Sequence, residues 1–427
     1  MGRSNDPFFL PLFFVCFSSW LSLHSSADTS TSQLSQTQTR IMGNLSRSLR
    51  SSFSDSTWNT SDPNPCRWGG VKCSDSGNSS VVKILDLSRV GLSTARNSSS
   101  TAGFFDLLCR LDSLESLDLS RNAFTGIPGG FFFANCSVSH GLKSLNLSSN
   151  MLHGDLPNFS GFTSLETLDL SHNNLGGAVD SQLDGLARLK SLNLSVNSFT
   201  GGMPALGKSQ GLEELVLSAN SFDGQIPSDI GGHRNLTLLD LSQNDLSGST
   251  LNLSVNSFTG GMPALGKSQG LEELVLSANS FDGQIRSDIG GHRNLTLLDL
   301  SQNDLSGSTP DGIGNLSKLE TLLLSSNSLG GLIPRSLSDI TSLSRFAANQ
   351  NRFIGSIPSG ITKYVRVLDL SYNNLGGEIP ADLLSSPNLV SVDLTNNSLR
   401  GPIPKNLSQN LYRLRLGRNS LNGTQLQ

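Results

Sequence analysis

The chain has 427 residues and a formal net charge of -4, and only 15% of its residues are charged. It therefore has no basic surface of the kind that nucleic-acid-binding proteins carry. Its 43 glycines, with abundant Ser, Asn and Leu, indicate a turn-rich repeat protein with a polar but weakly charged surface.

The N-terminus has the composition of a secretory signal. Arg3 precedes an apolar stretch over residues 8–17, and Ala27 is a small residue suited to cleavage after it. Pro11 makes the stretch too short to span a bilayer, and no later segment reaches the roughly 20 apolar residues that a spanning helix needs. We expect residues 1–27 to be a signal peptide, so that the chain as written enters the secretory pathway and is extracellular.

An N-terminal cap is expected over residues 28–80. Ile41, Leu45 and Leu49 have helical spacing and predict a short amphipathic helix. Cys66 and Cys73 then flank a tryptophan, which suggests a disulfide-closed lid over the first apolar coil of a stack. A zinc site is the alternative, but no histidine lies near these two cysteines.

Two further cysteines complete an even number for an oxidising compartment. Cys109 and Cys136 precede successive repeats by five and six residues, and neighbouring strands lie about 4.8 Å apart. They are placed either to bridge adjacent coils or to remain a pair of buried thiols.

From residue 81 to 427 the sequence repeats every 22 to 24 residues. The segment 114–126 gives the template LxxLxLxxNxLxG. Leucines alternating with polar residues specify a short strand with one buried face, and the Asn can bond backbone groups where the chain turns inward. Recurring Ile-Pro pairs such as Ile333-Pro334 add an apolar anchor and discourage a helix on the return arc. The predicted fold is an α/β solenoid, a curved right-handed superhelix with parallel strands on its concave face and irregular or 3-10 return arcs.

A near-identical duplication interrupts the repeats. Residues 192–250 recur as 251–309 with one difference, Pro227 against Arg286. The block of 59 residues is not a whole number of coils, so the coil that begins at Leu236 has about half its usual length. We expect a register break near 245–254, and the near-identity indicates either a recent duplication or an assembly error.

Several motifs resemble catalytic sites without the context that catalysis needs. Residues 202–209 match GxxxxGK[ST] and residues 207–211 match GxSxG, but a strand of the repeat follows them, where both motifs require a helix. The histidines show no ligand spacing and are expected to be solvated, as are the aspartates that recur at the strand centres. No catalytic residue, metal or cofactor is predicted, although a kinase domain absent from this fragment would belong to the longer protein.

Ligand contacts are expected where the concave face departs from its usual Ser/Asp/Ser pattern. Such departures occur late in the chain, and aromatic and arginine residues dominate binding hot spots, with clustered arginines suiting carboxylate or sulfate groups. The candidates are Arg345, Asn349, Gln350, Tyr372, Arg413, Arg415 and Arg418. An ordinary solvated surface is the alternative for all of them.

Fifteen Asn-x-Ser/Thr sequons make the chain a candidate glycoprotein. Asn146, Asn193 and Asn252 are sequons at strand centres, where a glycan would obstruct the concave face. Other acceptor candidates are Asn44, Asn59, Asn78, Asn97, Asn235, Asn315 and Asn406.

The complete repeat LxxLxLxxNxLxGxIP, clear in 319–334 and 389–404, resembles the plant-type leucine-rich repeat. The cap pattern from Trp58 to Cys73 is similar to that of plant leucine-rich-repeat receptor-like kinases, and the resemblance covers about residues 40–427. It implies a ligand-recognition ectodomain, truncated here, of a receptor-like kinase or receptor-like protein. Such a protein senses a peptide or other extracellular ligand at the plasma membrane, usually with a co-receptor kinase.

Two alternatives remain at this stage. A secreted inhibitor of cell-wall polysaccharide hydrolases has similar repeats but would normally end in a paired-cysteine cap, which is absent before Gln427. An enzyme is supported only by the two motif matches above. The sequence does not identify the ligand.

Overall fold

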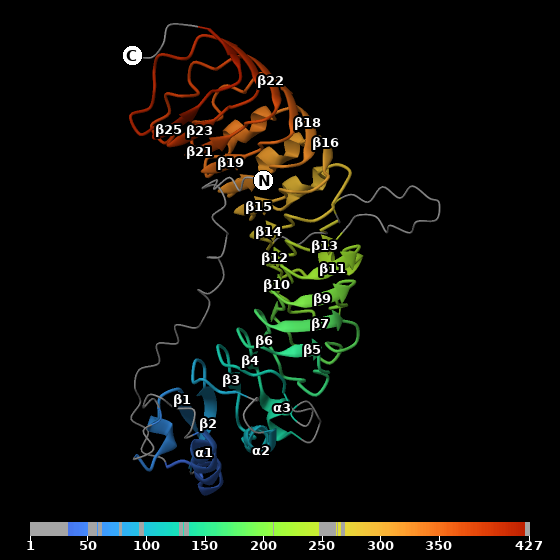
Figure 1. Ribbon diagram of the computed structural model, residues 1–427, viewed down its shortest axis with the longest axis vertical. Helices are drawn as coiled ribbons and strands as arrows, with labels where there is room; N and C mark the ends of the chain where they lie inside the picture. The colour runs from blue at the N-terminus through green and yellow to red at the C-terminus, as the bar shows by residue number, and fades with distance from the viewer. Residues whose placement is uncertain are drawn as a thin grey trace, which may run out of the picture.

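The protein forms a long curved stack of coils (Figure 1). The structure is a computed structural model that describes residues 33–49, 58, 62–76, 79–93, 98–127, 131, 136–207, 209–246, 262, 264–265 and 270–422. The predicted signal peptide, residues 1–27, lies outside the described residues. The leucine-rich solenoid expected from the repeats is confirmed, because successive coils pair side by side through a single continuous sheet.

This long sheet lines the hollow side of the curve (Figure 1). Its pairs are parallel, except that β1 and β2 form an antiparallel hairpin in the cap. Each repeat contributes a three-residue strand. The central side chain of this strand faces the core, and the two flanking side chains face outward. The strands are β1 (Val71–Ser76), β2 (Ser79–Asp86), β3 (Ser116–Asp118), β4 (Ser144–Asn146), β6 (Thr167–Asp169), β8 (Ser191–Asn193), β10 (Glu214–Val216), β12 (Leu238–Asp240), β14 (Glu273–Val275), β15 (Leu297–Asp299), β17 (Thr321–Leu323), β19 (Arg345–Ala347), β21 (Val367–Asp369), β23 (Ser391–Asp393) and β25 (Arg413–Arg415).

Shorter strands on the opposite side form two further parallel sheets, which the sequence did not predict. The first contains β5 (His153–Asp155), β7 (Asn174–Ala178), β9 (Ser198–Gly201), β11 (Ser221–Gly224) and β13 (Asp245–Leu246). The second contains β16 (Ser306–Ser308), β18 (Ser328–Leu332), β20 (Arg352–Gly355), β22 (Asn374–Glu378), β24 (Ser398–Gly401) and β26 (Ser420–Leu421). The expected 3-10 arcs are present as η3 (Ser228–Gly232), η4 (Ser287–Gly291), η5 (Asp311–Asn315) and η6 (Arg335–Asp339).

Aliphatic side chains fill the interior, and an asparagine ladder satisfies the buried turns. Leu319, Leu322 and Leu324 of one coil are all completely buried. In the same coil Asn327 donates from Nδ2 to the carbonyl of Leu300 in the preceding coil, at 2.9 Å, and its Oδ1 accepts from the Leu305 amide at 3.0 Å. The role predicted for the Asn column is confirmed, since the amide bonds backbone groups of two coils where the chain turns inward.

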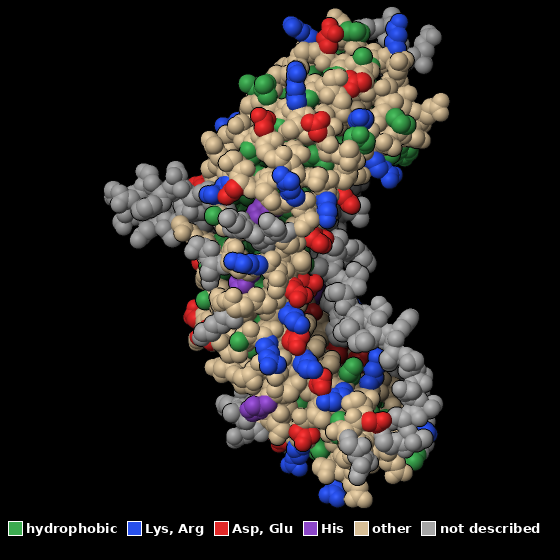
Figure 2. Space-filling model, turned by 180° about the vertical axis from the view of Figure 1, so that it is seen from behind, with side chains coloured by type: hydrophobic (Ala, Val, Ile, Leu, Met, Phe, Trp, Pro, Cys, Tyr) green, Lys and Arg blue, Asp and Glu red, His purple; other side chains and the backbone are tan. Residues whose placement is uncertain are grey.

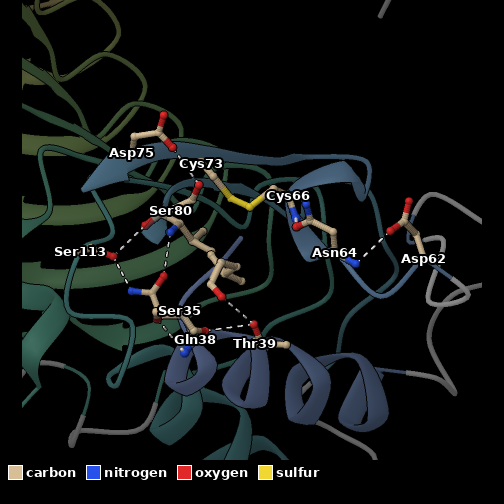
Figure 3. The surroundings of a disulfide bond; sticks show 12 residues. Ser35, Gln38, Thr39, Asp62, Asn64, Cys66, Cys73, Asp75, Ser80 and Ser113 are labelled. Carbon is tan, nitrogen blue, oxygen red and sulfur yellow. Dashed lines mark hydrogen bonds between the residues drawn. A yellow bond between two sulfur atoms is a disulfide. The ribbon is translucent and has the colours of Figure 1, made fainter. Parts of the chain in front are cut away.

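The N-terminal cap contains α1 (Gln36–Leu49) and η1 (Pro65–Arg67), with Ile41, Leu45 and Leu49 buried as their spacing predicts. Figure 3 shows Gln38 reaching from α1 towards Ser113 of the first repeats. The Oε1 atom of Gln38 also accepts a hydrogen bond from the Val82 amide at 2.7 Å. These bonds fix the helix over the end of the stack.

Two disulfides stabilise this end of the protein. Cys66 and Cys73 join η1 to β1 (Figure 3). Cys109 and Cys136 are also bonded, which decides between the two arrangements that their spacing allowed. The second bridge connects the end of α2 (Ser98–Leu108) to the start of α3 (Ser137–Gly141) and closes a loop of 27 residues.

The duplication changes the number of residues between two paired strands of the long sheet. From β4 onward, corresponding residues of other neighbouring coils are 22 to 24 positions apart, but Leu238 of β12 pairs with Glu273 of β14, 35 positions later. In the described part of the chain the outer strands also divide here, between β13 and β16. Most of the predicted register break, near 245–254, lies outside the described residues and stays a prediction.

Two histidines correct the sequence interpretation. His233 and His292, the copies created by the duplication, were expected to be solvated, but each is 4% exposed. The Nδ1 atom of His233 lies 3.1 Å from the carbonyl oxygen of Ser209 in the preceding coil. A polar ring at this position links neighbouring coils, and this link accounts for its burial.

Candidate functional site

The candidate site is the hollow face of the long sheet. Neighbouring strands are in register, so equivalent residues of successive coils form rows that cross the sheet. One row contains Glu214, Leu238, Glu273, Leu297, Thr321, Arg345, Val367, Ser391 and Arg413. The composition of this face changes along the stack, and the change distinguishes two parts.

In the N-terminal part, charged side chains neutralise one another. Glu115 lies 2.7 Å from both Lys83 and Lys143, and Glu166 lies 2.7 Å from Lys190. Hydrogen bonds from Lys143 and then Lys83 lower the pKa of Glu115. Because these partners are partly exposed, each pair contributes little to stability. They nevertheless neutralise Glu115 and Glu166 within the face itself.

Four of the six recurring strand aspartates are buried, which corrects their assignment to the solvated surface, whereas Asp118 and Asp240 are partly exposed. Asp169, Asp299, Asp369 and Asp393 are each less than a tenth exposed. Their Oδ1 atoms accept hydrogen bonds from the backbone amide two residues later, as Asp299 does from Ser301 at 2.9 Å. Burial raises the pKa of Asp169, Asp299 and Asp369. These carboxylates are structural acceptors that close the turn after each strand.

Farther along, apolar side chains replace polar ones and a shallow pocket forms. Leu297 and Leu323 face outward from the sheet yet are only 9% and 8% exposed. They belong to a pocket of about 190 Å³ across β14, β15, β17 and β19. Its full lining is Glu273, Thr296, Leu297, Glu320, Thr321, Leu323 and Arg345.

Three charged side chains border Leu297 and Leu323 in this pocket, and none of them is paired with a group of opposite charge in the described structure. Among the described residues, Glu273, Glu320 and Arg345 make no ion pair, and the buried Nε of Arg345 has no hydrogen-bond partner. Burial raises the pKa of Glu273, and the nearby carboxylates Glu272, Asp240 and Glu214 raise it further. Figure 2 shows acidic side chains about half-way along the molecule, interspersed with Lys and Arg side chains.

The structure brings only some of the predicted ligand contacts together. Arg345 lines the pocket. Arg413 and Arg415 lie in the last strand of the long sheet, three strands beyond Arg345. Arg415 is 3.4 Å from the buried carboxylate of Asp393, so part of its charge is already compensated. As ligand-binding residues, all of these stay predictions.

The remaining candidates lie in the turns that follow the strands. The Oδ1 of Asn349 accepts a hydrogen bond from Ser325 of the preceding coil. Tyr372 and Arg418 have φ of 54° and 57°, the left-handed conformation that one residue of nearly every coil adopts at this turn. Tyr372 is held by a 2.8 Å bond from its amide to the Thr395 carbonyl. Its backbone geometry therefore belongs to the repeat and is not evidence of a specialised site.

The sequence interpretation missed the pocket itself. Leu297, Leu323, Glu273 and Glu320 were not candidates, because only arginine, aromatic and amide departures from the Ser/Asp/Ser pattern were considered. A leucine that replaces a polar residue at an outward-facing strand position was the available clue. This clue is difficult to see at residues 322–324, which are all leucines. The first and third face the core, whereas the second faces outward.

Sequons divide into buried and exposed groups, and we expect glycosylation to follow this division. Asn146 is 6% exposed, donates to Asp118, and accepts from the amide and hydroxyl of Ser148. An attached glycan would break these bonds and separate adjacent strands. Asn235, Asn315 and Asn406 are exposed. The other acceptor candidates Asn59, Asn78, Asn97 and Asn252 lie outside the described residues.

Glycopeptide mass spectrometry of the protein secreted from a eukaryotic host should find Asn146 unmodified. Asn235, Asn315 and Asn406 should carry glycans in the same sample and serve as internal controls. A glycan on Asn146 of the folded protein would contradict this division. Its absence would leave the hollow face near β4 open to a ligand.

The described residues contain no cluster of three or more His, Cys, Asp and Glu side chains that could hold a metal ion. Ser209, which the two catalytic-looking motifs share, is 2% exposed and donates to the Leu186 carbonyl at 2.8 Å. That hydroxyl joins two coils of the stack and is inaccessible to a substrate.

Protein-family models described as leucine rich repeats match several parts of the chain. One covers residues 112–175, and a second covers 211–233, 294–316, 318–340, 364–385 and 388–409. The receptor protein-tyrosine kinase CEPR1 of Arabidopsis thaliana is 32% identical over 191 residues, which are 44% of this chain and 18% of that protein. Receptor-like protein kinase 7 of the same organism is 38% identical over 126 residues, or 27% and 11% of the two chains.

Solved structures give the same result over more of the chain. The crystal structure of PEPR1-AtPEP1 is similar with a TM-score of 0.69 and 32% identity, covering 89% of this chain and 58% of that one. The chain is a leucine-rich-repeat solenoid that is similar to the ectodomains of plant receptors. A TDR receptor is also similar, with a TM-score of 0.63, 29% identity, and coverage of 77% and 62%.

This leucine-rich-repeat chain spans less than a fifth of the two curated receptor kinases that it matches. The matched part is the repeat region, which is not catalytic. Within the described residues no helix has both the length and the apolar character needed to cross a membrane.

Proposed function

We propose that this chain is the ligand-recognition ectodomain of a plant receptor-like kinase or receptor-like protein, and that it binds an extended peptide on the hollow face of its long sheet. The observation that carries the proposal is the change in that face along the stack. Glu115 and Glu166 are paired with lysines near β3 to β8. From β14 to β19, by contrast, Glu273, Glu320 and Arg345 form no ion pair in the described structure and lie beside outward-facing leucines. Apolar surface beside uncompensated charge is typical of a binding site.

A solved relative with a bound factor supports ligand recognition by the repeats, and the family resemblance favours a peptide as the ligand class. The solved structure of the leucine-rich-repeat ectodomain of the receptor kinase GASSHO1/SCHENGEN3 from Arabidopsis thaliana is a complex with CASPARIAN STRIP INTEGRITY FACTOR 2. It has a TM-score of 0.55 and 31% identity to this chain, covering 81% of this chain and 45% of that one. By the same family resemblance, a co-receptor kinase is the proposed second partner, and the plasma membrane is the proposed location of the longer protein.

Two matched tryptophan substitutions, one on the hollow face and one on the outer side, test which face of the protein binds peptides. Ser391 lies on the hollow face in β23, and Ser398, in the same coil, is exposed on the outer strand β24. Peptides selected on the intact chain from a random-sequence phage library should lose affinity at least about tenfold for Ser391→Trp, because the indole fills the face. Ser398→Trp should leave the affinity unchanged.

The late arginines supply a second test of the same proposal. Arg413→Ala together with Arg415→Ala should weaken the peptides that Ser391→Trp excludes, because clustered guanidinium groups bind carboxylates. Affinity is measured by calorimetry, with thermal unfolding showing that each variant is folded. Selected peptides that tolerate Ser391→Trp but are lost with Ser398→Trp would place binding on the outer side and contradict the proposal.

A further inference from the structure

The row of residues that crosses the pocket has an order that a ligand can complement. Glu273, Leu297, Thr321 and Arg345 are direct neighbours on four consecutive strands. A carboxylate therefore lies at one end, a guanidinium at the other, and an apolar floor between them. Leu323 widens that floor from the adjacent row.

The lack of internal pairing is what indicates a ligand here. Elsewhere on the same face Glu115 and Glu166 are paired with lysines at 2.7 Å. In the described structure Glu273 and Arg345 are held three strands apart, too far to neutralise each other, and Glu320 between them is likewise without an ion pair. Uncompensated charges on a partly desolvated surface gain most when a partner of opposite charge arrives.

The spacing of the row matches an extended peptide that runs along the stack. Strands about 4.8 Å apart place the backbones of Glu273 and Arg345 roughly 14 Å apart. An extended peptide advances about 3.3 Å per residue, so the first and fifth residues, four steps apart, are separated by about 13 Å. Its side chains alternate, and therefore the first, third and fifth residues of the segment face the sheet together.

We propose that this pocket binds a peptide segment with a basic residue, an apolar residue and an acidic residue at alternate positions. The basic side chain lies over Glu273, the apolar side chain over Leu297 and Leu323, and the acidic side chain over Arg345. The aliphatic stem of the basic residue also covers apolar surface while its head reaches the carboxylate. This inference rests on the proposed function and adds the chemistry of the ligand to it.

The pocket does not depend on which copy of the duplicated block is present. Glu273, Thr296 and Leu297 repeat Glu214, Thr237 and Leu238 of the first copy. In a chain without residues 251–309, the first-copy residues would precede the unchanged Glu320, Thr321, Leu323 and Arg345. The same lining would therefore form, and the inference applies to both forms of the chain.

Capped synthetic peptides test the pattern on the full chain. One contains Lys-Thr-Leu-Thr-Glu and one contains the reversed order Glu-Thr-Leu-Thr-Lys. Two analogues each lose one charged side chain, with Lys replaced by norleucine or Glu replaced by Gln. We expect one of the two charge orders to bind about tenfold more tightly than the other and than both analogues. Equal binding of all four peptides would overturn the inference.

A charge exchange in the protein makes the test specific to this pocket. The double variant Glu273→Lys with Arg345→Glu should invert the preference between the two peptide orders, because it reverses the charges of the row and keeps their sum. Glu273→Gln alone should lose the advantage of Lys over norleucine. Glu378→Gln is the matched control, since Glu378 is exposed on the outer strand β22 and should change nothing.

The outcomes separate this inference from the proposed function. Peptides that Ser391→Trp excludes, but that show no charge-order preference or no inversion in the double variant, would overturn the inference and leave peptide recognition intact. Binding that responds only to substitutions on the outer face would overturn the proposed function. Inversion of the preference with unchanged thermal stability would support both.

Discussion

Replacing Asn351 with alanine is expected to lower the free energy of unfolding by about 1–3 kcal/mol. Asn351 is 9% exposed, and its Nδ2 donates to the carbonyls of Leu324 at 2.8 Å and Ala348 at 3.2 Å. Its Oδ1 accepts from the Leu329 amide at 2.9 Å. The Leu324 and Ala348 carbonyls would each keep a second donor, from Asn327 and Asn373. Alanine would remove the acceptor of the Leu329 amide, at about 1–3 kcal/mol if that group remains buried.

Urea unfolding followed by far-UV circular dichroism measures this loss. Asn374→Ala is the matched control, because Asn374 is exposed at the start of β22 and its side chain makes no hydrogen bond within the described structure. The control should change stability by no more than about 0.5 kcal/mol. Similar small effects at both positions would show that water or backbone rearrangement replaces the ladder, contrary to this account of the turns.

The inner strands and the ladder could be predicted from the sequence because their causes are local. Alternating leucines such as Leu322 and Leu324 fix which side of a strand faces the core, and a buried turn needs an amide such as Asn327. The outer strands could not be predicted in this way. In β18 the sequence Ser-Leu-Gly-Gly-Leu has the composition of a turn, and it becomes a strand because the next coil presents β20 in register.

The candidate site was only partly predictable for a related reason. Arg345 stands out by residue type, whereas Leu323 lies between two core leucines and its outward direction follows from the strand register. The aspartates show a similar limit. Asp299 appears solvent-facing in the pattern of one coil, but β14 and β17 lie on either side of its strand and bury it. Burial on this face is a property of neighbouring coils, which a single repeat does not contain.

Deleting residues 251–309 is expected to convert a two-step unfolding reaction into a single cooperative one. Coils of a solenoid are coupled only to their neighbours, so a weak interface allows the two sides to unfold separately. In the full chain the described outer strands are divided between β13 and β16. Restored outer pairing would add a few backbone hydrogen bonds, each contributing about 0.5–1.5 kcal/mol to the coupling.

The deletion restores both spacing and local sequence. Leu238 and Thr321 are 83 positions apart, and removal of 59 leaves 24, which is the interval between Leu297 and Thr321. Residues 247–250 would then precede Pro310, as the identical residues 306–309 do in the full chain. No new junction sequence is created, so the change in unfolding can be attributed to the register.

Urea titrations followed by circular dichroism and by tryptophan fluorescence would measure the difference. The two signals should separate for the full chain, because the described tryptophans Trp58 and Trp68 lie in the cap, and should coincide after the deletion. Deleting residues 319–342 is the control: it removes one whole coil of 24 residues without correcting the register, and should leave the two steps separate. Coincident signals in the full chain would contradict this prediction. They would mean that two contacts across the duplication are enough to make unfolding cooperative: the pairing of β12 with β14, and the 2.9 Å hydrogen bond from Asn279 to the Leu241 carbonyl.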